Sequence, residues 1–387
     1  MLVVLVAAQF CCTSVWFAGN AVLADLVTRL ALPAGAAGPL AAAVQLGFLL
    51  GTLVFAVLAV ADRFSPVRVF ALAAGAAALT NLAAGWAGHT LTTLLLTRAA
   101  TGFCLAGIYP VGMKIASDHF AAGLGRSLGY LVGALVLGTA LPHLLRGVGG
   151  DYAYRTVFAA TSALCLLGGA AVAVFVPDGP HRRPAGRVRL TAFAAVFRPP
   201  AFRAAAGGYF GHMWELYSFW AFAPLWLAAA LPGLSATQVA LAAFGVIGVG
   251  GLACAAAGHL AERYGTARVA WAALATSGGC CLLSPLVYGA GPAVVVCFLL
   301  VWGAAVVADS PLFSTLVARA ALPELRGTAL TVVNGVGYAI TVASLFLLGR
   351  VAVALPPAWW FLLLVPGPLA GLWALTAGGR ERPLRQR

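Results

Sequence analysis

Long apolar runs separated by short polar turns are the dominant pattern of this chain. Most runs are about 20 residues long, the length that an α-helix needs to cross the hydrocarbon core of a bilayer. Turn residues such as Leu32-Pro33, Gly88-His89 and Gly291-Pro292 separate them. The pattern predicts an all-α integral membrane protein with twelve transmembrane helices. These fall near residues 3–25, 38–60, 67–87, 91–116, 127–145, 155–176, 204–229, 236–258, 268–288, 292–317, 328–348 and 357–377.

The positions of the basic residues predict how these helices are oriented. If the N-terminus lies inside, 17 of the 23 Lys and Arg residues fall in cytoplasmic segments. Arg29, Arg146, Arg155 and Arg350 fall on the other side, and two more lie within spans. This is the positive-inside pattern, so we expect a multi-pass inner-membrane protein with both termini in the cytoplasm. Met1 opens into an apolar run without a basic flank, so this run is interpreted as a first span and not as a signal peptide.

An internal repeat relates the two halves of the chain at a spacing of 200 residues. Residues 61–69 align with residues 261–269, with acid, base, aromatic residue and second base in register. Arg126 and Arg326 match at the same spacing, and the longest polar interruption lies between the repeats. We therefore expect four parts: a first six-helix bundle (1–176), a basic cytoplasmic linker (177–202), a second bundle (203–377) and a basic cytoplasmic tail (378–387).

Composition supports a lipid environment and argues against several other classes of protein. Hydrophobic residues make up 62% of the chain and charged residues 9%, whereas soluble domains carry roughly 25% charged residues. The net charge of +13 comes from short arginine clusters between apolar runs and not from one basic stripe, so we expect the lipid bilayer as a partner and no nucleic acid. The eight cysteines lie inside apolar runs without metal-ligand spacing and predict small buried side chains, with no metal site.

The second copy of the repeat carries a recognisable loop motif. The run Gly258-His259-Leu260-Ala261-Glu262-Arg263-Tyr264-Gly265, followed by Arg268, resembles the loop signature of the major facilitator superfamily, which has an acid and an arginine between two glycines and then basic residues. The first copy has Leu58 and Ser65 where the signature has glycines. Arg98, with Gly102 four residues on, resembles the motif of the family's fourth span.

This resemblance implies a fold of two six-helix bundles with a solute site between them at mid-depth. Transport would then proceed by alternating access, with one half rocking against the other. We therefore expect a secondary transporter of a small-molecule substrate, coupled to protons and working as a monomer. The alternative is a transport-inactive relative that serves as a sensor or as a membrane assembly partner.

Neither an enzyme nor a cofactor site is expected. The run Gly248-Val249-Gly250-Gly251-Leu252-Ala253 has the spacing of a dinucleotide fingerprint, but it lies inside an apolar span with no preceding soluble strand. Small residues there favour close packing of helices.

Acidic residues beside arginines mark a candidate cytoplasmic gate. Asp62 and Arg63 occupy the turn after the second span, and Glu262 and Arg263, with Gly258, occupy the equivalent turn after the eighth. Such pairs can hold one conformational state and release in the other. The alternative is a basic turn with an incidental acid.

Four charged residues lie within spans, where a charge is costly unless it has a partner or a water-filled cavity. They are Arg98, Lys114, Glu215 and Asp309. The resemblance places spans one, four, seven and ten around the central cavity, and all four charges lie on these spans.

His212 and Glu215 are three residues apart on one helix and can touch. A carboxyl group away from water tends to keep its proton and an imidazole titrates near neutrality, so the pair suits proton loading and release. We expect proton coupling at Glu215 as the main carrier, at His212, at Arg98 and at Asp309. Substrate binding and purely structural hydrogen bonds remain the alternatives, and Asp309 could serve as a site residue or as an ion-pair partner.

Helical spacing also predicts residues of the substrate cavity. Gln9, Thr13, Trp16 and Asn20 form one polar stripe in the first span at 100° per residue. In the fourth span Lys114 lies opposite Arg98 on an ideal helix unless Pro110 bends it back, and it could instead extend toward the membrane surface. The predicted cavity residues are Gln9, Trp16, Asn20, Tyr109, Lys114, Trp302, Asn334 and Tyr338.

Overall fold

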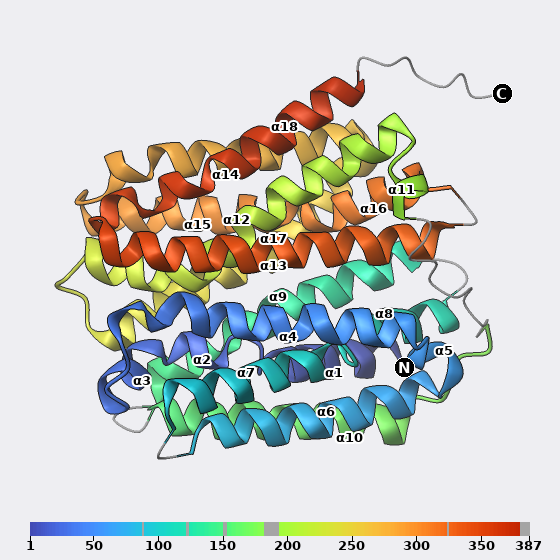
Figure 1. Cartoon of the computed structure of the whole chain (residues 1–387), viewed down its shortest axis with the longest axis horizontal. Coiled ribbons are helices and arrows are strands. Elements are labelled where there is room, and N and C mark those ends of the chain that lie inside the picture. The colour runs from blue at the N-terminus through green and yellow to red at the C-terminus, as the bar shows by residue number, and fades with distance from the viewer. Residues whose placement is uncertain (87–88, 121–123, 150–152, 182–192, 323–324, 380–387) are drawn as a thin grey trace.

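A computed structural model describes residues 1–86, 89–120, 124–149, 153–181, 193–322 and 325–379. Helices are the only regular structure in these ranges. Residues 182–192 of the predicted linker and the predicted tail after residue 379 lie outside the described residues. The helices lie roughly along one axis in two groups, one coloured blue to green and the other yellow to red in Figure 1.

The first half contains the first six predicted spans, some of them broken into segments. Its helices are α1 (Leu2–Thr13), α2 (Ala18–Ala21), α3 (Leu23–Arg29), η1 (Ala34–Ala36), α4 (Ala37–Val57), α5 (Val60–Arg63), α6 (Pro66–Ala84), α7 (Leu91–Leu105), α8 (Tyr109–His119), α9 (Leu124–Val148) and α10 (Ala153–Phe175).

The second half repeats this arrangement. Its helices are α11 (Phe193–Val196), α12 (Pro200–Ala230), α13 (Ala236–Tyr264), α14 (Thr266–Val287), α15 (Pro292–Ala308), α16 (Ser310–Ala320), α17 (Arg326–Ala354), η5 (Pro357–Leu364) and α18 (Pro366–Gly379).

The twelve predicted spans are confirmed as two bundles of six. Ten helical stretches in the described ranges are long and apolar enough to cross a membrane by length and composition. The remaining two spans are the first, which is divided among α1, α2 and α3, and the seventh, which is the 31-residue helix α12. Most boundaries differ by a few residues, and α13 and α17 extend six residues beyond their predicted ends.

Helix pairs pack in the same way in both halves. In the first half α4 packs on α7 and α6 on α10, and in the second half α13 packs on α15 and α14 on α18. The crossings rely on glycine, because a Cβ atom on Gly47 of α4 or on Gly102 of α7 would collide with the backbone of the other helix. Gly303 of α15 packs in the same way on the Val246 carbonyl group of α13. The repeat in the sequence is therefore also a repeat in packing.

Breaks in the fourth and tenth spans lie at equivalent places. α7 ends at Leu105 and α8 starts at Tyr109, directly before Pro110. α15 ends at Ala308 and α16 starts at Ser310, directly before Pro311. Proline cannot donate a backbone hydrogen bond and its ring clashes with the preceding turn, so the helix is interrupted directly before each proline.

The two halves meet along two pairs of long helices, α9 with α13 and α4 with α17. Met1 and the end of α18 lie at one end of the molecule, here called the basic end because Arg63 and Arg263 are exposed there (Figure 1). At the opposite end, here called the far end, a Cβ atom on Gly38 of α4 would lie 2.9 Å from the Cα atom of Gly349 of α17.

Contact between α9 and α13 is tight toward the far end and looser toward the basic end. Gly147 packs against Leu241, where a Cβ atom would lie 3.0 Å from the leucine side chain. At the basic end of the same helices, Gly129 and Gly258 have no atom of the described residues within 4 Å of a Cβ position. In this arrangement the halves are joined at the far end.

Candidate functional site

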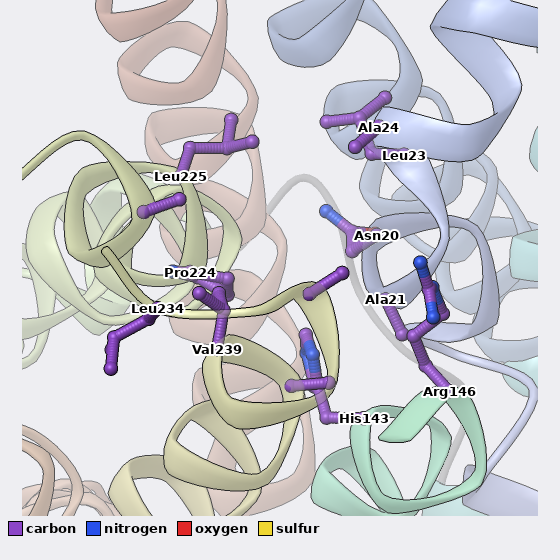
Figure 2. A pocket seen from close by; sticks show the side chains of 13 residues that line it. Asn20, Ala21, Leu23, Ala24, His143, Arg146, Pro224, Leu225, Leu234 and Val239 are labelled. Atoms are coloured by element: carbon purple, nitrogen blue, oxygen red, sulfur yellow. The ribbon is translucent and has the colours of Figure 1, made fainter. Parts of the chain in front are cut away.

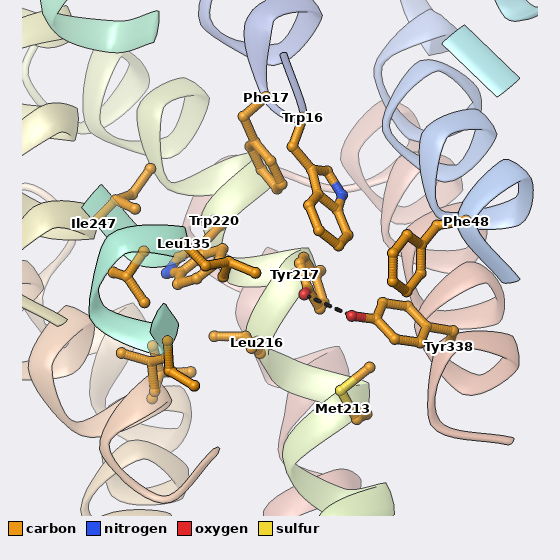
Figure 3. Packing of buried hydrophobic residues seen from close by; sticks show 14 of the residues in the cluster. Trp16, Phe17, Phe48, Leu135, Met213, Leu216, Tyr217, Trp220, Ile247 and Tyr338 are labelled. Carbon is orange, nitrogen blue, oxygen red and sulfur yellow. Dashed lines mark hydrogen bonds between the residues drawn. The ribbon is translucent and has the colours of Figure 1, made fainter. Parts of the chain in front are cut away.

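Aromatic side chains from both halves meet at the centre of the molecule. Figure 3 shows this aromatic cluster, which consists of Trp16, Phe17 and Phe48 from the first half and of Tyr217, Trp220 and Tyr338 from the second.

Ring contacts in the aromatic cluster cross from one half to the other. The Trp16 ring centroid lies 4.7 Å from that of Phe48 and 5.9 Å from that of Tyr217. Phe48 lies 4.6 Å from Tyr338, and all four side chains are buried. The interface here is therefore a surface of packed aromatic rings.

Hydrogen-bonding groups in the aromatic cluster are few and uncharged. The hydroxyl groups of Tyr217 and Tyr338 lie 3.1 Å apart and are hydrogen-bonded. The indole N–H groups of Trp16 and Trp220 are buried and have no partner within the described part of the chain. A buried donor without a partner is costly, so these two N–H groups can serve a ligand that brings an acceptor.

Two predicted cavity residues, Trp16 and Tyr338, belong to this cluster. Tyr109 and Asn334 are half-buried, on α8 and α17. Sequence spacing missed Phe17, Phe48, Tyr217 and Trp220, because the cavity residues were chosen along the polar faces of the spans. One signal in the sequence could have found these four residues, because their aromatic rings lie on three of the predicted spans, the first, second and seventh.

The first span is broken directly beside this cluster. α1 ends at Thr13, whose hydroxyl group donates to the Gln9 carbonyl oxygen at 2.8 Å, and the Ser14 hydroxyl group donates to the Cys11 carbonyl oxygen at 2.7 Å. Side-chain bonds of this kind compete with the regular helix. Residues 14–17 therefore leave the helix and place Trp16 and Phe17 at the interface.

Arg98 binds the carbonyl groups that this break exposes. Its Nη2 atom donates to the carbonyl oxygens of Val15 at 3.0 Å and Trp16 at 2.6 Å, and its Nη1 atom donates to Oδ1 of Asn81 at 2.8 Å. The side chain is 1% exposed, and its charge faces the ends of a broken helix, where carbonyl dipoles favour a cation. Arg98 therefore lies inside the first half, behind the aromatic cluster.

The predicted polar stripe of the first span does not form, because the helix ends in its middle. Gln9 is fully buried near Gly112 of α8, and neither atom of its amide has a partner within the described residues. Trp16 is in the aromatic cluster. Asn20 lies on α2, where it lines a separate cavity at the far end. The three residues thus occupy three different places.

His212 pairs with Asp309 and not with Glu215 as the sequence spacing suggested. The His212 Nδ1 atom lies 2.8 Å from Oδ1 of Asp309, and both side chains are at most 1% exposed. Asp309 is the residue at which α15 ends and α16 begins. The pair therefore joins α12 to the bend of the tenth span.

Glu215 points into the second half, between α14 and α15. Its carboxylate accepts hydrogen bonds from the Trp302 indole at 2.6 Å, from the Ser277 hydroxyl group at 2.9 Å and from the Cys281 thiol at 3.4 Å. Trp302, predicted to line the cavity, is instead stacked on Phe219 with ring centroids 4.5 Å apart. Both residues are fully buried within their own half.

Lys114 lies at the basic end and not in the central cavity. Its ammonium group is 3.0 Å from the Asp62 carboxylate and 3.5 Å from that of Asp118. The bend before Pro110 turns α8 so that Lys114 reaches the turn after the second span. Asp62 of the predicted gate therefore pairs with this lysine, and the adjacent Arg63 is exposed.

The second copy of the gate turn has a different shape. α13 runs unbroken through Glu262 to Tyr264, and Gly265 turns the chain with φ of +94°, a value that glycine adopts without strain. The first copy has Ser65 at this position, which instead caps α6 by accepting from the Arg68 N–H. Glu262 and Arg263 are exposed on the basic end.

No group of three His, Cys, Asp or Glu side chains in the described ranges is arranged to hold a metal ion.

Comparison with known families identifies a match over most of the chain. The sequence model described as Major Facilitator Superfamily matches residues 5–345. Comparison with curated proteins found no significant match.

Three solved structures show the same architecture. A mutant of the nucleoside transporter NupG shares 14% sequence identity with a TM-score of 0.77, over 98% of this chain and 99% of that one. A bacterial homologue of the human lysosomal transporter Spinster, inward-facing and occupied, shares 15% identity with a TM-score of 0.73, over 98% and 96%. The xylose transporter XylE from E. coli, partially occluded and inward open, shares 13% identity with a TM-score of 0.77, over 99% of both chains.

Proposed function

Because the chain belongs to the major facilitator superfamily, we propose that it transports a small uncharged solute with a ring that can stack, and that protons drive the transport. Members of this family are secondary transporters that work by alternating access, and the match of residues 5–345 covers both halves.

The aromatic cluster is the observation that supports an uncharged solute. It is the mid-depth surface shared by both halves, and it offers rings, two phenol groups and two indole N–H groups. The four charged residues of the spans lie elsewhere, with Arg98, Glu215 and Asp309 bonded inside their own halves and Lys114 at the basic end. A charged solute at the cluster would lose water without gaining a countercharge.

The structurally similar transporters are compatible with this solute class but do not identify the substrate. NupG is a nucleoside transporter and XylE a xylose transporter, so the fold serves ring-shaped solutes in other proteins. Their identity to this chain is too low to transfer a substrate.

Uptake into proteoliposomes tests the solute class. A panel of labelled nucleosides, sugars, carboxylates and amines is offered under an imposed pH gradient, and we expect saturable uptake of an uncharged ring compound. Trp16→Ala should reduce this uptake at least tenfold, because its ring contacts both halves. Trp373→Ala is the matched control, since that side chain is 73% exposed on α18.

Preferential uptake of a charged compound that Trp16→Ala leaves unchanged would contradict the proposal. Failure of every compound to cross, with the protein correctly inserted, would favour the alternative of a transport-inactive sensor or assembly partner.

We place the coupling proton at the His212–Asp309 pair, with Glu215 as the second candidate. The pair bridges α12 and the bend of the tenth span, so a change in its protonation changes the attraction between two elements of the second half. Glu215 has three donors from two neighbouring helices, which hold it in one place. Arg98 bonds to uncharged groups, and a coupling role for it remains a prediction.

Two variants separate these carriers. Asp309→Asn should abolish accumulation driven by a pH gradient and retain exchange of labelled for unlabelled solute, because exchange needs no net protonation cycle. Glu215→Gln should keep proton-driven accumulation if the pair is the carrier. The reverse result would assign the proton to Glu215. Asp178→Asn, at an exposed position, is the control.

The basic end is proposed to face the cytoplasm of the cell, with the protein in the inner membrane as a monomer and without enzymatic activity. Arg63, Arg263 and Arg268 are exposed at this end, as the positive-inside pattern requires. Alkaline phosphatase fused after Arg387 should be inactive and a fusion after Gly150 active. The opposite result would reverse the orientation.

At this cytoplasmic end, Asp62 with Lys114 and Glu262 with Arg263 remain the proposed gate residues. The 3.0 Å contact of Asp62 with Lys114 supports a role for the first copy in holding its turn against α8. Glu262 and Arg263 are exposed in this state, so their contribution would come in the conformation with the basic end closed.

A further inference from the structure

A cavity of about 290 Å³ lies at the far end, between the two halves and away from the aromatic cluster. Its walls come from α2, α3 and α9 of the first half and from α12, the turn after it and α13 of the second. Figure 2 shows that most of the lining is aliphatic, with three polar side chains, Asn20, His143 and Arg146, on the side of the first half.

His143 is the buried group that this cavity leaves without a partner. Its side chain is 1% exposed, and its Nε2 atom has no hydrogen-bond partner among the residues that the structure describes. The ring lines the cavity. Because burying an unpaired polar atom costs about 1–3 kcal/mol, this nitrogen points to a ligand that supplies its partner.

Arg146 adds a cationic group on the same face of α9. It follows His143 by three residues, so the two side chains are neighbours on the helix. Its Nε and Nη2 atoms bind the Asp25 carboxylate of α3 at 2.7 Å and 3.0 Å. This contact fixes the guanidinium plane beside the cavity, and Nη1 has no bond to another of the described residues, so it can donate to a ligand.

The opposite wall carries no polar side chain within the described lining. It consists of Pro224, Leu225 and Ala228 of α12, with Leu234 and the first turn of α13. A ligand that fits both walls has one acceptor group at one end and a short aliphatic body at the other.

We propose that this far-end cavity binds a short-chain aliphatic monocarboxylate. Its carboxylate accepts from Nε2–H of His143 and from Nη1–H of Arg146, with the Asn20 amide beside them, and its alkyl chain lies on Pro224, Leu225 and Ala228. The bound molecule contacts both halves at the end where they are joined. It therefore stabilises the arrangement with the far end closed, and opening of that end requires its release.

Calorimetric titration of the purified full-length protein with sodium hexanoate tests this site, and it needs no transported solute. We expect saturable binding of one hexanoate per chain. His143→Phe should weaken it at least tenfold by removing one donor to a charged group, and Ala228→Trp should abolish it by filling the cavity from the other half. His259→Phe and Ala255→Trp, both at exposed positions of α13, are the matched controls and should bind as the original protein does.

Thermal unfolding of each variant without hexanoate shows that it is folded, and hexanoate should raise the melting temperature only where the cavity is intact. Equal binding of 1-hexanol would overturn the carboxylate assignment. Saturable binding that persists in both cavity variants, or its absence in the original protein, would overturn the site.

Discussion

Arg98 donates only to uncharged groups, although it is buried in the middle of the first half. Its three acceptors are the carbonyl oxygens of Val15 and Trp16 and the amide oxygen of Asn81. Asn81 in turn donates to Thr161 and Ser162 of α10. One side chain thus links the broken first span to the third, fourth and sixth spans, and it fixes the backbone that carries Trp16.

Replacing Arg98 should therefore destabilise the protein more than replacing an exposed arginine. Arg98→Gln leaves two buried carbonyl groups without a donor, and we expect a loss of about 2–4 kcal/mol in unfolding free energy. Thermal unfolding in detergent measures the change. Arg155→Gln, at an exposed position, should leave the melting temperature unchanged; equal stability of the two variants would contradict the structural role of Arg98.

Residue spacing identified which side chains in the second half are polar and buried, but not their partners. His212 and Glu215 do lie on neighbouring parts of α12. Each, however, has its own partner on the tenth span: His212 contacts Asp309, and Glu215 accepts a hydrogen bond from Trp302. The helix period fixes directions around one axis, whereas the partner depends on which helix packs there, and a single sequence does not contain that packing.

Helices were predicted well where the length and apolarity of a run determine a span. They were predicted poorly where side-chain hydrogen bonds interrupt a helix. Twelve apolar runs predicted twelve spans, and Pro110 indicated a bend in the fourth. The break after Thr13 has no proline or glycine at its start. It follows from hydroxyl groups that bond back to carbonyl oxygens and from Arg98, which lies 85 positions away and was predicted to serve proton coupling.

Close crossings of helices depend on single glycines, so substitutions at these glycines should lower stability more than substitutions at glycines without close contacts. Gly102→Ala and Gly303→Ala each place a methyl group against a neighbouring backbone, so each should cost about 1–3 kcal/mol through overpacking. Gly75→Ala and Gly279→Ala lie on helices of the same halves, with no atom of the described residues within 4 Å, and should not lower stability. Melting temperatures of the four variants check this, and similar losses at all four positions would contradict the assignment of the loss to these two backbone contacts.

At the scale of the whole molecule, the far end is the place where the halves are joined. A Cβ atom on Gly35 would lie 3.6 Å from Cγ2 of Val353, across the interface. Cysteines at these two positions are close enough for a disulfide. We expect oxidation of Gly35→Cys/Val353→Cys to stop transport and reduction to restore it, because alternating access requires this end to open.

The cross-linked protein should remain accessible to a thiol-labelling reagent from the basic end. A cysteine introduced at Glu262 should still be labelled in the oxidised form, and the single variants Gly35→Cys and Val353→Cys should transport normally under oxidation. Full transport with the disulfide formed would show that the far end does not have to separate at this point.

Each half supplies the hydrogen-bond or ion-pair partners of its own buried charged groups. Arg98 is bonded within the first half, and Glu215 and the His212–Asp309 pair are bonded within the second. Between the halves lie rings, aliphatic side chains and backbone brought close at glycines. Each half therefore resembles a subunit of a heterodimer, and the segment that connects them acts as a tether that raises the local concentration of one subunit around the other. An interface without fixed polar pairs at its centre can slide with little loss of contact, which is the mechanical property that a rocking pair of subunits needs.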